Sequence, residues 1–493
     1  MRIMKFIAAA VMLLIAVALV PLAWEWRSPF LVDFRPWLLL GMIALPLGLI
    51  FVQTWVLRTS RRRQWTFRAI SALGIIIAAS ALTITVTLEG RFQWERYHVL
   101  HADPGQLERL GRHFIVGYRD SAEVQQLIKL RAVAGIFLSG GNVRGKSMAE
   151  VQQIIKSFQR QRQEQGLPPL WIATDQEGGS VSRLSPPLTR LSSLSQIVER
   201  YSDPDQREQA VREFARKQGS ELASVGVNLN LAPVVDLNYK LINPNDRYTR
   251  VFERAISGDP AVVTQVAGWY SAELEEVGVR CTLKHFPGLG RVFEDTHLDP
   301  ANLTASVAEL TDTDWLPFRS LMRQSRAFTM LGHVRLTALD KDHPASMSRA
   351  VIAGLLRGAW NYNGVLITDN FSMAAVYRSG EGMQNGSVQA LNAGVDLILI
   401  SWDPDQFYPV MCALLKADKQ GKLNREALER SDHRLEMARG KLSGLVPRLQ
   451  PGNENEGWRW PEAWRRARMA GLRKTKDETK IKSGYNTNCG DLI

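Results

Sequence analysis

The feature that most constrains the fold is an alternation of short apolar runs and longer amphipathic segments between residues 110 and 443. The runs are almost wholly apolar before they reach a polar end, which is typical of parallel strands covered on both faces. They lie at 113–118, 134–140, 170–176, 227–236, 281–286, 328–334, 365–370 and 395–401. Eight strand–helix units predict an α/β fold, a (β/α)8 TIM-type barrel, with a doubly wound open sheet as the alternative.

Three apolar stretches without a charged residue precede this repeat, at about 6–24, 37–57 and 69–88. Each is close to the ~20 residues that a helix needs to cross a bilayer, although buried core helices are an alternative. We therefore expect a lipid bilayer as a partner. The expected domains are a membrane anchor with three transmembrane helices (1–91), a barrel (92–446) and a flexible basic tail (447–493).

The loop after the second stretch indicates the orientation in the membrane. It carries five arginines between residues 58 and 68, so the positive-inside rule predicts a cytoplasmic loop. The third helix would then leave residues from about Glu89 onward on the periplasmic or extracytoplasmic side of a bacterial-type cytoplasmic membrane. The first stretch is alternatively a cleaved signal at Ala16-Val17-Ala18, which leaves the large domain on the same side.

The formal net charge of +12 is concentrated at the two ends of the chain. The first 91 residues carry +7 and residues 447–493 carry +4, which leaves about +1 for the expected barrel. We therefore expect no nucleic acid partner, because such a domain concentrates Lys and Arg on its folded body. The tail interleaves Trp and Arg at 458–468, a pattern typical of a membrane-surface segment or of a solvated extension.

The three cysteines are Cys281, Cys412 and Cys489, and their spacing matches no metal-binding motif. We expect neither a metal nor another cofactor.

Polar residues stand at the carboxyl ends of six apolar runs. They are Asp175, Asp236, His285, His333, Asp369 and Ser401. In a barrel these positions converge on one face, where catalytic groups sit, so the pattern indicates an enzyme. The alternative is that they cap loops.

Two segments suggest specific chemistry. Asp369 ends the run GVLITD, where the strand would fix its carboxylate for attack on an anomeric carbon. Lys284 and His285 close an earlier strand, and Asp295 and His297 follow in its loop, two residues apart. An Asp beside a His fixes the tautomer of the ring and makes it a proton carrier. An incidental ion pair in a surface loop is the alternative.

A third segment, TDQEGGSVSRL, places Asp175 before Gly178 and Gly179. Glycines permit close backbone approach, so Asp175 and Arg183 are candidates for holding sugar hydroxyls. Alternatively, Glu177 and the glycines only shape a tight turn.

Over residues 110–443 the chain resembles glycoside hydrolase family 3, in particular its single-barrel β-N-acetylhexosaminidases of the peptidoglycan-recycling type. The resemblance lies in DQEGG-x-V-x-R, KHFPG-x-G followed by D-x-H, and ITD-x-x-SM, which occur in the family's order. Leu289 stands where the family usually has His, and Ser180 where it usually has Arg.

The resemblance implies that Asp369 is the nucleophile, that His297 carries the proton and that Asp295 completes the acid/base pair. The implied sugar-binding residues are Asp175, Arg183, Arg254, Lys284 and His285. Arg254 matches loosely, because the usual Arg-Ser-Phe reads Arg-Ala-Ile here, and Arg247 competes with it. Larger family members take the acid/base from a second domain; here the basic tail leaves no room for one, so the barrel is expected to supply it.

The sequence thus predicts a retaining exo-glycosidase that removes terminal β-linked N-acetylhexosamine from peptidoglycan-type or related envelope glycans through a covalent glycosyl-enzyme. The alternatives are a β-glucosidase-type member of the family, a phosphorylase of the same fold, or a non-catalytic glycan-binding envelope protein. The sequence makes no prediction of the oligomeric state.

Overall fold

The structure is a computed structural model that describes residues 2–59 and 65–440. The tail expected at 447–493, with Cys489, lies outside the described residues. The chain divides into two compact units. One contains Met1–Ala102 and Asp405–Cys412, and the other contains Asp103–Pro404 and the remainder from Ala413.

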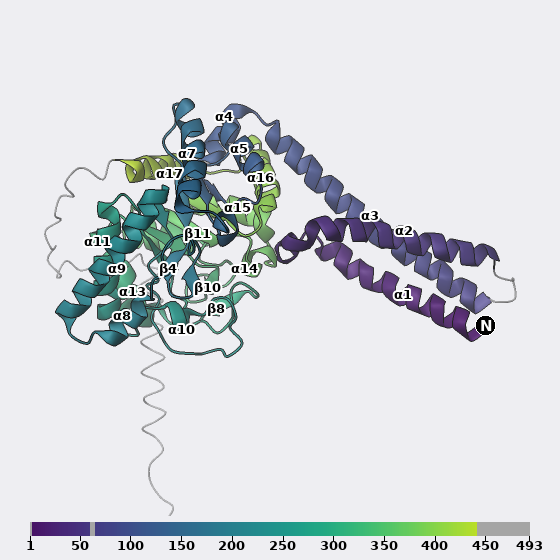
Figure 1. Cartoon of the computed structure of the whole chain (residues 1–493), viewed down its shortest axis with the longest axis horizontal. Coiled ribbons are helices and arrows are strands. Elements are labelled where there is room, and N and C mark those ends of the chain that lie inside the picture. The colour runs from purple at the N-terminus through teal and green to yellow at the C-terminus, as the bar shows by residue number, and fades with distance from the viewer. Residues whose placement is uncertain (1, 60–64, 441–493) are drawn as a thin grey trace, which may run out of the picture. The chain divides into compact units, whose positions relative to one another are not determined.

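The first unit is built from long apolar helices (Figure 1). They are α1 (Arg2–Glu25), the short 3₁₀ helix η1 (Pro29–Phe34), α2 (Arg35–Thr59) and α3 (Trp65–Leu100). Small side chains such as Ala23 and Ala81 are buried where the helices pack. Within this unit Arg27 and Arg35 both form ion pairs with Asp405, each at 2.8 Å.

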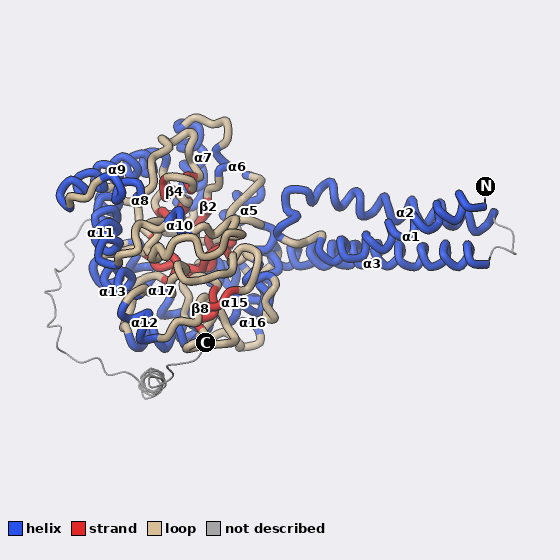
Figure 2. The backbone as a smooth tube through the Cα atoms, turned by 90° about the horizontal axis from the view of Figure 1, so that it is seen from below, coloured by secondary structure: helices blue, strands red, loops and turns tan. Residues whose placement is uncertain are grey.

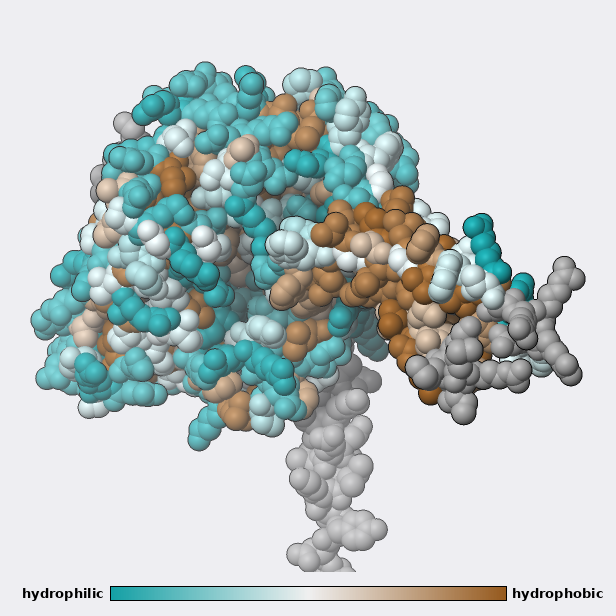
Figure 3. Space-filling view, turned by 45° about the vertical axis from the view of Figure 1, so that its right-hand side comes forward, coloured by the Kyte–Doolittle hydropathy of each residue, from teal (hydrophilic) through white to brown (hydrophobic). Residues whose placement is uncertain are grey.

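Three segments of this unit are long and apolar enough to cross a membrane, namely Phe6–Glu25, Pro29–Thr59 and Trp65–Leu100. Large apolar side chains point outward from them, and Leu14 and Phe51 are 68% and 74% exposed. The brown surface of these helices in Figure 3 shows how continuous this apolar cover is. Such a surface suits lipid contact and indicates membrane anchoring. Helix α3 runs on past residue 91, and the Arg91–Glu95 pair supports this extension.

The second unit contains a parallel sheet of eight strands. In chain order the strands are β1 (Phe114–Val116), β2 (Gly135–Phe137), β3 (Trp171–Thr174), β6 (Leu229–Asn230), β7 (Thr282–Phe286), β9 (Phe328–Leu331), β11 (Leu366–Asn370) and β12 (Leu397–Ile400). Each strand pairs with its neighbour in the chain, and β12 pairs with β1. Parallel bridges between Leu229 and Arg280 and between Val234 and Lys284 join β6 to β7, which closes the ring. The predicted (β/α)8 TIM-type barrel is confirmed, and each strand lies within its predicted run.

Helices surround the barrel, as Figure 2 shows in blue around the red strands. The helices of the second unit are α4 (Pro104–Gly111), α5 (Ser121–Lys129), α6 (Gly140–Val143), α7 (Met148–Glu164), α8 (Leu194–Arg200), α9 (Pro204–Val225), α10 (Val251–Arg254), α11 (Pro260–Glu276), α12 (Val307–Asp312), α13 (Trp315–Gln324), a π-helix (Ala350–Ala359), α14 (Ala374–Tyr377), α15 (Gly382–Ala393) and α17 (Arg425–Arg439). The 3₁₀ helix η3 (Pro404–Gln406) and α16 (Phe407–Lys419) are divided between the two units. Several begin at a local signal. Asp203 caps the amide of Gln206 just before Pro204, and Ser147 forms a capping box with Glu150.

Two small strand pairs lie outside the barrel sheet. β4 (Gln176–Gly178) and β5 (Val181–Ser182) form an antiparallel hairpin directly after β3. β8 (Ala301–Leu303) pairs in parallel with β10 (Val334–Leu336), and both follow barrel strands, β7 and β9 respectively. These pairs fix the loops at the carboxyl ends of the strands.

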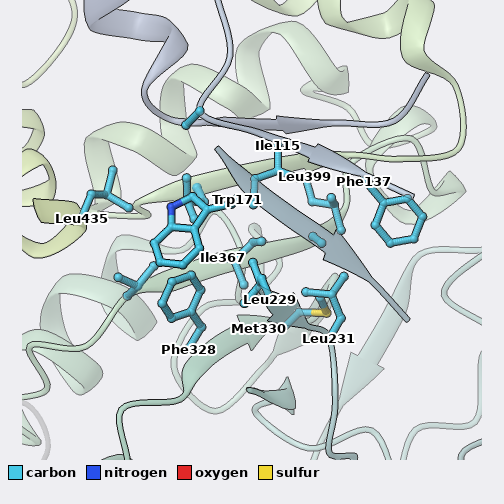
Figure 4. Close-up of a cluster of buried hydrophobic side chains, with 14 residues drawn as sticks. Ile115, Phe137, Trp171, Leu229, Leu231, Phe328, Met330, Ile367, Leu399 and Leu435 are labelled. Carbon is cyan, nitrogen blue, oxygen red and sulfur yellow. The ribbon is translucent and has the colours of Figure 1, made fainter. Parts of the chain in front are cut away.

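The barrel interior is filled by side chains that point inward from the strands (Figure 4). Ile115, Leu229, Ile367 and Leu399 are almost fully buried there. Trp171 and Phe328 meet edge to face, with ring centroids 5.1 Å apart. A barrel packed in this way is a solid support, so ligand-binding groups are left to the strand ends and their loops.

Candidate active site

Four charged side chains meet at the carboxyl ends of β3 and β7. The ammonium of Lys284 on β7 lies 2.8 Å from Asp175 and 2.7 Å from Glu177. Arg254, the last residue of α10, donates two hydrogen bonds to Glu177, of 2.9 and 2.6 Å. Two cations therefore face two carboxylates, and the network has no net formal charge.

The network is largely buried, and the low local dielectric strengthens the attraction between its charges. Burial alone would raise the pKa of Glu177, but the charges of Arg254 and Lys284 outweigh it and hold the pKa well below its ordinary value. Burial likewise opposes the charge on Lys284, yet the charges of Asp175 and Glu177 outweigh it and raise the pKa of Lys284. The Asp175 side chain is 22% exposed, against 7% for Glu177, so Asp175 is the more accessible of the two carboxylates.

His285, the next residue on β7, is held by a buried carboxylate. Its Nδ1 lies 2.7 Å from Oδ2 of Asp236, which follows β6. Oδ1 of Asp236 accepts a hydrogen bond of 2.7 Å from the amide of Leu289. Nδ1 of His285 is thus occupied by Asp236, which leaves Nε2 as the ring atom for a ligand.

The pair Asp295 and His297 lies in the loop between β7 and β8. Oδ1 of Asp295 lies 3.1 Å from Nδ1 of His297 and accepts a 2.8 Å hydrogen bond from the hydroxyl of Thr249. Oδ2 accepts from the amides of Arg247 and Tyr248, at 3.2 and 3.0 Å. The carboxylate thus joins the loop that carries His297 to the loop around residue 248.

The charge state of Asp295 follows from these contacts. Burial alone would raise its pKa, but the hydrogen bonds from His297 and Thr249 outweigh this and hold the pKa well below its ordinary value. An ionised Asp295 orients the ring of His297 with Nδ1 inward. His297 is only half-buried, with 27% of its side chain exposed, so Nε2 can reach a ligand.

Asp369 lies on β11 and is partly exposed. Its Oδ1 accepts a 2.7 Å hydrogen bond from the amide of Asn370. Burial opposes its charge, but the imidazoles of His285, His333 and His297 outweigh burial and lower the pKa of Asp369. Asp369 is therefore an ionised carboxylate at neutral pH, fixed on a strand and open to a ligand.

His333 contacts the end of β11. Its ring is fully buried between Ser346, whose hydroxyl lies 2.7 Å from Nδ1, and the carbonyl of Asn370, 3.1 Å from Nε2. Burial lowers the pKa of His333 below its ordinary value. The ring thus ties β11 to the loop after β10.

The structure brings most of the predicted site residues to this one face of the barrel. Arg183 lies beside Asp175, because its amide donates a 3.1 Å hydrogen bond to the Asp175 carbonyl, and its side chain is exposed. Arg247 is also exposed, whereas Arg254 is in the buried network. Sequence reasoning missed the part that Glu177 plays. Its only sequence signal was an acidic residue beside two glycines.

Together these groups suit a nucleophilic displacement at carbon. A carboxylate fixed on a strand, such as Asp369, suits nucleophilic attack, and a ring oriented by a carboxylate, as His297 is by Asp295, suits proton transfer. Asp175, Lys284 and His285 present an acceptor and two donors that match the hydroxyl groups of a polyol. The arrangement suits a ligand with several hydroxyls and one reactive centre.

Known proteins share this sequence pattern and fold. Residues 100–438 match the Glycosyl hydrolase family 3 N terminal domain. The Beta-hexosaminidase LpqI of Mycobacterium tuberculosis is 30% identical over 349 residues, which cover 68% of this chain and 83% of that protein. Two solved structures also match. The glycoside hydrolase family 3 β-N-acetylglucosaminidase of Paenibacillus sp. str. FPU-7 superposes with a TM-score of 0.62 and 30% identity, covering 70% of this chain and 65% of its own. The β-N-acetylhexosaminidase of Beutenbergia cavernae gives 0.60 and 27% identity, covering 69% of this chain and all of its own.

Proposed function

The chain belongs to glycosyl hydrolase family 3 and is a glycoside hydrolase, and we propose that it removes terminal β-linked N-acetylglucosamine with retention of configuration. The observation that carries the proposal is the pairing of two differently held groups on one face of the barrel. Asp369 is a fixed, ionised carboxylate at the end of β11, and His297 lies on the loop after β7, where the buried carboxylate of Asp295 orients it.

In the first step a carboxylate oxygen of Asp369 forms a bond to the anomeric carbon while the bond to the glycosidic oxygen breaks. Nε2 of His297, protonated at this stage, gives its proton to that oxygen, and the aglycone leaves as an alcohol. In the second step His297 takes a proton from water, whose oxygen attacks the anomeric carbon and releases Asp369. Two displacements restore the original β configuration.

The sugar class is supported by the names of similar proteins, which are β-hexosaminidases and a β-N-acetylglucosaminidase. It is tested by release of 4-nitrophenol from the β-N-acetylglucosaminide and the β-glucoside by the full chain in detergent. We expect the former to be preferred. Preference for the glucoside would keep the hydrolase and reject the N-acetylhexosaminidase.

The nucleophile is tested by Asp369→Ala. We expect turnover to fall by about 10⁴-fold or more, as befits loss of a group that forms the covalent intermediate. Asp205→Asn, an exposed carboxylate at the start of α9, is the matched control and should keep full turnover. Added azide should restore turnover of Asp369→Ala and yield the α-glycosyl azide. A β-azide, or rescue of the control, would contradict the assignment.

The proton carrier is tested by His297→Asn, with the exposed His433→Asn on α17 as its control. We expect His297→Asn to be slow on substrates with poor leaving groups and much less impaired on 2,4-dinitrophenolate, which leaves without a proton. Equal loss on both substrates would argue against proton transfer to the leaving group. Repeating the assay in phosphate buffer identifies phosphorolysis, because a sugar 1-phosphate would then replace the free sugar.

We further propose that the barrel lies on the extracytoplasmic side of a bacterial-type membrane and trims peptidoglycan-type glycans. The arginine-rich segment between residues 58 and 68 supports this orientation through the positive-inside rule. Protease added to intact spheroplasts should digest the barrel if the orientation is right and leave it intact if the barrel is cytoplasmic. Release of N-acetylglucosamine from a muropeptide faster than from a chitin oligosaccharide would support the glycan class, and the reverse order would reject it.

A further inference from the structure

Two loops at the carboxyl ends of β6 and β7 carry most of the exposed hydrophobic side chains of the second unit. The loops are residues 231–250, between β6 and α10, and residues 287–300, between β7 and β8. Seven large hydrophobic side chains are exposed among the described residues of that unit, and four of them lie on these loops, namely Leu241, Ile242, Tyr248 and Phe293. Scattered exposed hydrophobic side chains are normal, whereas a gathering of them indicates a binding surface.

Hydrogen bonds hold the two loops together beside the proposed proton carrier. The side-chain amide of Asn243 donates a 2.8 Å hydrogen bond to the carbonyl of Phe293. The backbone amide of Tyr248 donates a 3.0 Å hydrogen bond to Oδ2 of Asp295, the carboxylate that orients His297. The exposed hydrophobic side chains are therefore carried by the same loops that position the proton carrier.

Tyr248 is the hydrophobic residue that lies against His297. The centroids of the two rings are 5.9 Å apart, and the ring planes are inclined by 39°. Tyr248 is 53% exposed, so much of its ring is open to a ligand even though it contacts His297. Its backbone is fixed by Asp295 and its side chain has only two rotatable bonds, so binding a ligand would cost little conformational entropy.

The proposed proton transfer places the leaving group beside this ring. Nδ1 of His297 is occupied by Asp295, so Nε2 gives the proton, and the glycosidic oxygen must come within about 3 Å of Nε2. The group that leaves with this oxygen then lies next to the imidazole that Tyr248 contacts. An aromatic ring has a negative face, which attracts the C–H bonds on the flat face of a pyranose ring.

We propose that Tyr248 binds the first sugar ring of the leaving group by stacking, and that it thereby selects glycans over glycosides with a small alkyl leaving group. The inference rests on the proposed glycosidase reaction, because it assigns the leaving-group side of that site. Tyr248 is a specificity-determining residue in this scheme, since the proton still comes from His297. Leu241, Ile242 and Phe293 offer further hydrophobic contacts on the same two loops.

The test compares kcat/KM for two substrates of the full chain in a neutral detergent. N,N′-diacetylchitobiose has a sugar as its leaving group, and methyl β-N-acetylglucosaminide has methanol, but both need a proton on the leaving oxygen. We expect Tyr248→Ala to lower kcat/KM for the disaccharide about tenfold and to leave that for the methyl glycoside within about twofold of wild type. Equal losses on both substrates would show that Tyr248 only supports His297, and would overturn the proposal. An unchanged value for the disaccharide would overturn it as well.

Two further variants identify the ring as the determinant. Tyr248→Phe keeps the aromatic face and should retain kcat/KM for the disaccharide, whereas a loss as large as that of Tyr248→Ala would overturn stacking. Tyr97→Ala is the matched control, because Tyr97 on α3 is 60% exposed and also lies against a histidine, His101, with ring centroids 4.1 Å apart. The control should hydrolyse both substrates as wild type does.

The remaining outcomes separate this inference from its alternatives. The assay is repeated with the full chain in vesicles of phosphatidylethanolamine and phosphatidylglycerol. A loss in Tyr248→Ala that occurs only in vesicles would assign the exposed side chains to lipid contact and overturn the proposal. A wild-type chain that cleaves neither glycoside would reject the proposed glycosidase reaction, and this inference with it. Failure of this inference alone would instead leave wild type active on both.

Discussion

The buried ion network of the active site makes a sharp prediction about stability. The perturbation is Glu177→Gln, which keeps the size of the side chain and removes its charge. Glu177 is the only carboxylate in the described structure that contacts both Lys284 and Arg254. The substitution leaves Lys284 with Asp175 alone and removes from Arg254 the carboxylate that held two of its donors.

The magnitude follows from the burial of the three partners. The side chains of Glu177, Lys284 and Arg254 are 7%, 2% and 10% exposed, so solvent screens the lost attraction very little. Removing one partner of a buried pair costs about 3–5 kcal/mol, because the other charge stays buried. In a domain of this size about 1 kcal/mol moves the unfolding midpoint by about 2 °C. We therefore expect the midpoint to fall by about 6–10 °C.

The assay is thermal unfolding of the full chain in detergent, monitored by near-ultraviolet circular dichroism. Glu273→Gln is the matched control, because Glu273 also contacts two arginines. Glu273 is as buried as Glu177, at 6% against 7% exposed, but its partners Arg212 and Arg216 are 31% and 59% exposed. Solvent therefore reaches the cations that the control leaves behind, and the control should cost only about 1 kcal/mol. A midpoint for Glu177→Gln within about 2 °C of the control would refute the argument from burial.

The lowered pKa of Glu177 also predicts how the stability difference between wild type and Glu177→Gln changes with pH. The pKa of Glu177 is lowered in the folded state, so its stabilisation is fully present above the unfolded pKa of about 4.3. It is lost as the pH falls through the folded pKa, which lies below that value. The gap between wild type and Glu177→Gln should be constant from pH 5 to 7 and shrink below about pH 4. A gap that widened on acidification would show that Glu177 is protonated in the folded protein.

Two further substitutions distinguish residues that affect the reaction from residues that only stabilise the fold. Asp295→Asn removes the carboxylate that orients His297, and we expect kcat to fall by about 10²-fold; an unchanged kcat in steady-state hydrolysis would contradict that role. Arg183→Ala should raise KM, because the residue lies beside Asp175, and should leave the unfolding midpoint unchanged, because its side chain is exposed. A shifted midpoint with unchanged KM would instead make Arg183 structural.

The barrel was predictable because its strands carry a strong local signal. Runs such as 395–401 are apolar on both faces, and buried parallel strands need that composition. The hairpin of β4 and β5 was not predicted, since its strands have three and two residues and are mostly polar. Their pairing depends on the barrel wall beside them, which no short window of sequence contains.

The site was predictable only as far as each residue stood at a strand end. Glu177 follows such an end but lies 77 residues from Arg254, and a single sequence gives no sign of which distant cation it meets. The choice between Arg247 and Arg254 was open for the same reason. The structure resolves their positions, because Arg254 ends α10 and turns into the network while Arg247 stays exposed.

The near-neutral charge of the barrel is compatible with the proposed site for a neutral sugar. At the carboxyl ends of the strands, two cations and two carboxylates balance one another inside the site. Arginines at the other end of the barrel also have carboxylates beside them, since Glu275 lies 3.9 Å from Arg280 and Asp396 pairs with Arg434 at 2.8 Å. An average of about +1 excludes a broad basic surface for a long polyanion, which needs cations spread over many ångströms. The charge count therefore agrees with an uncharged polyol as the substrate of the proposed reaction.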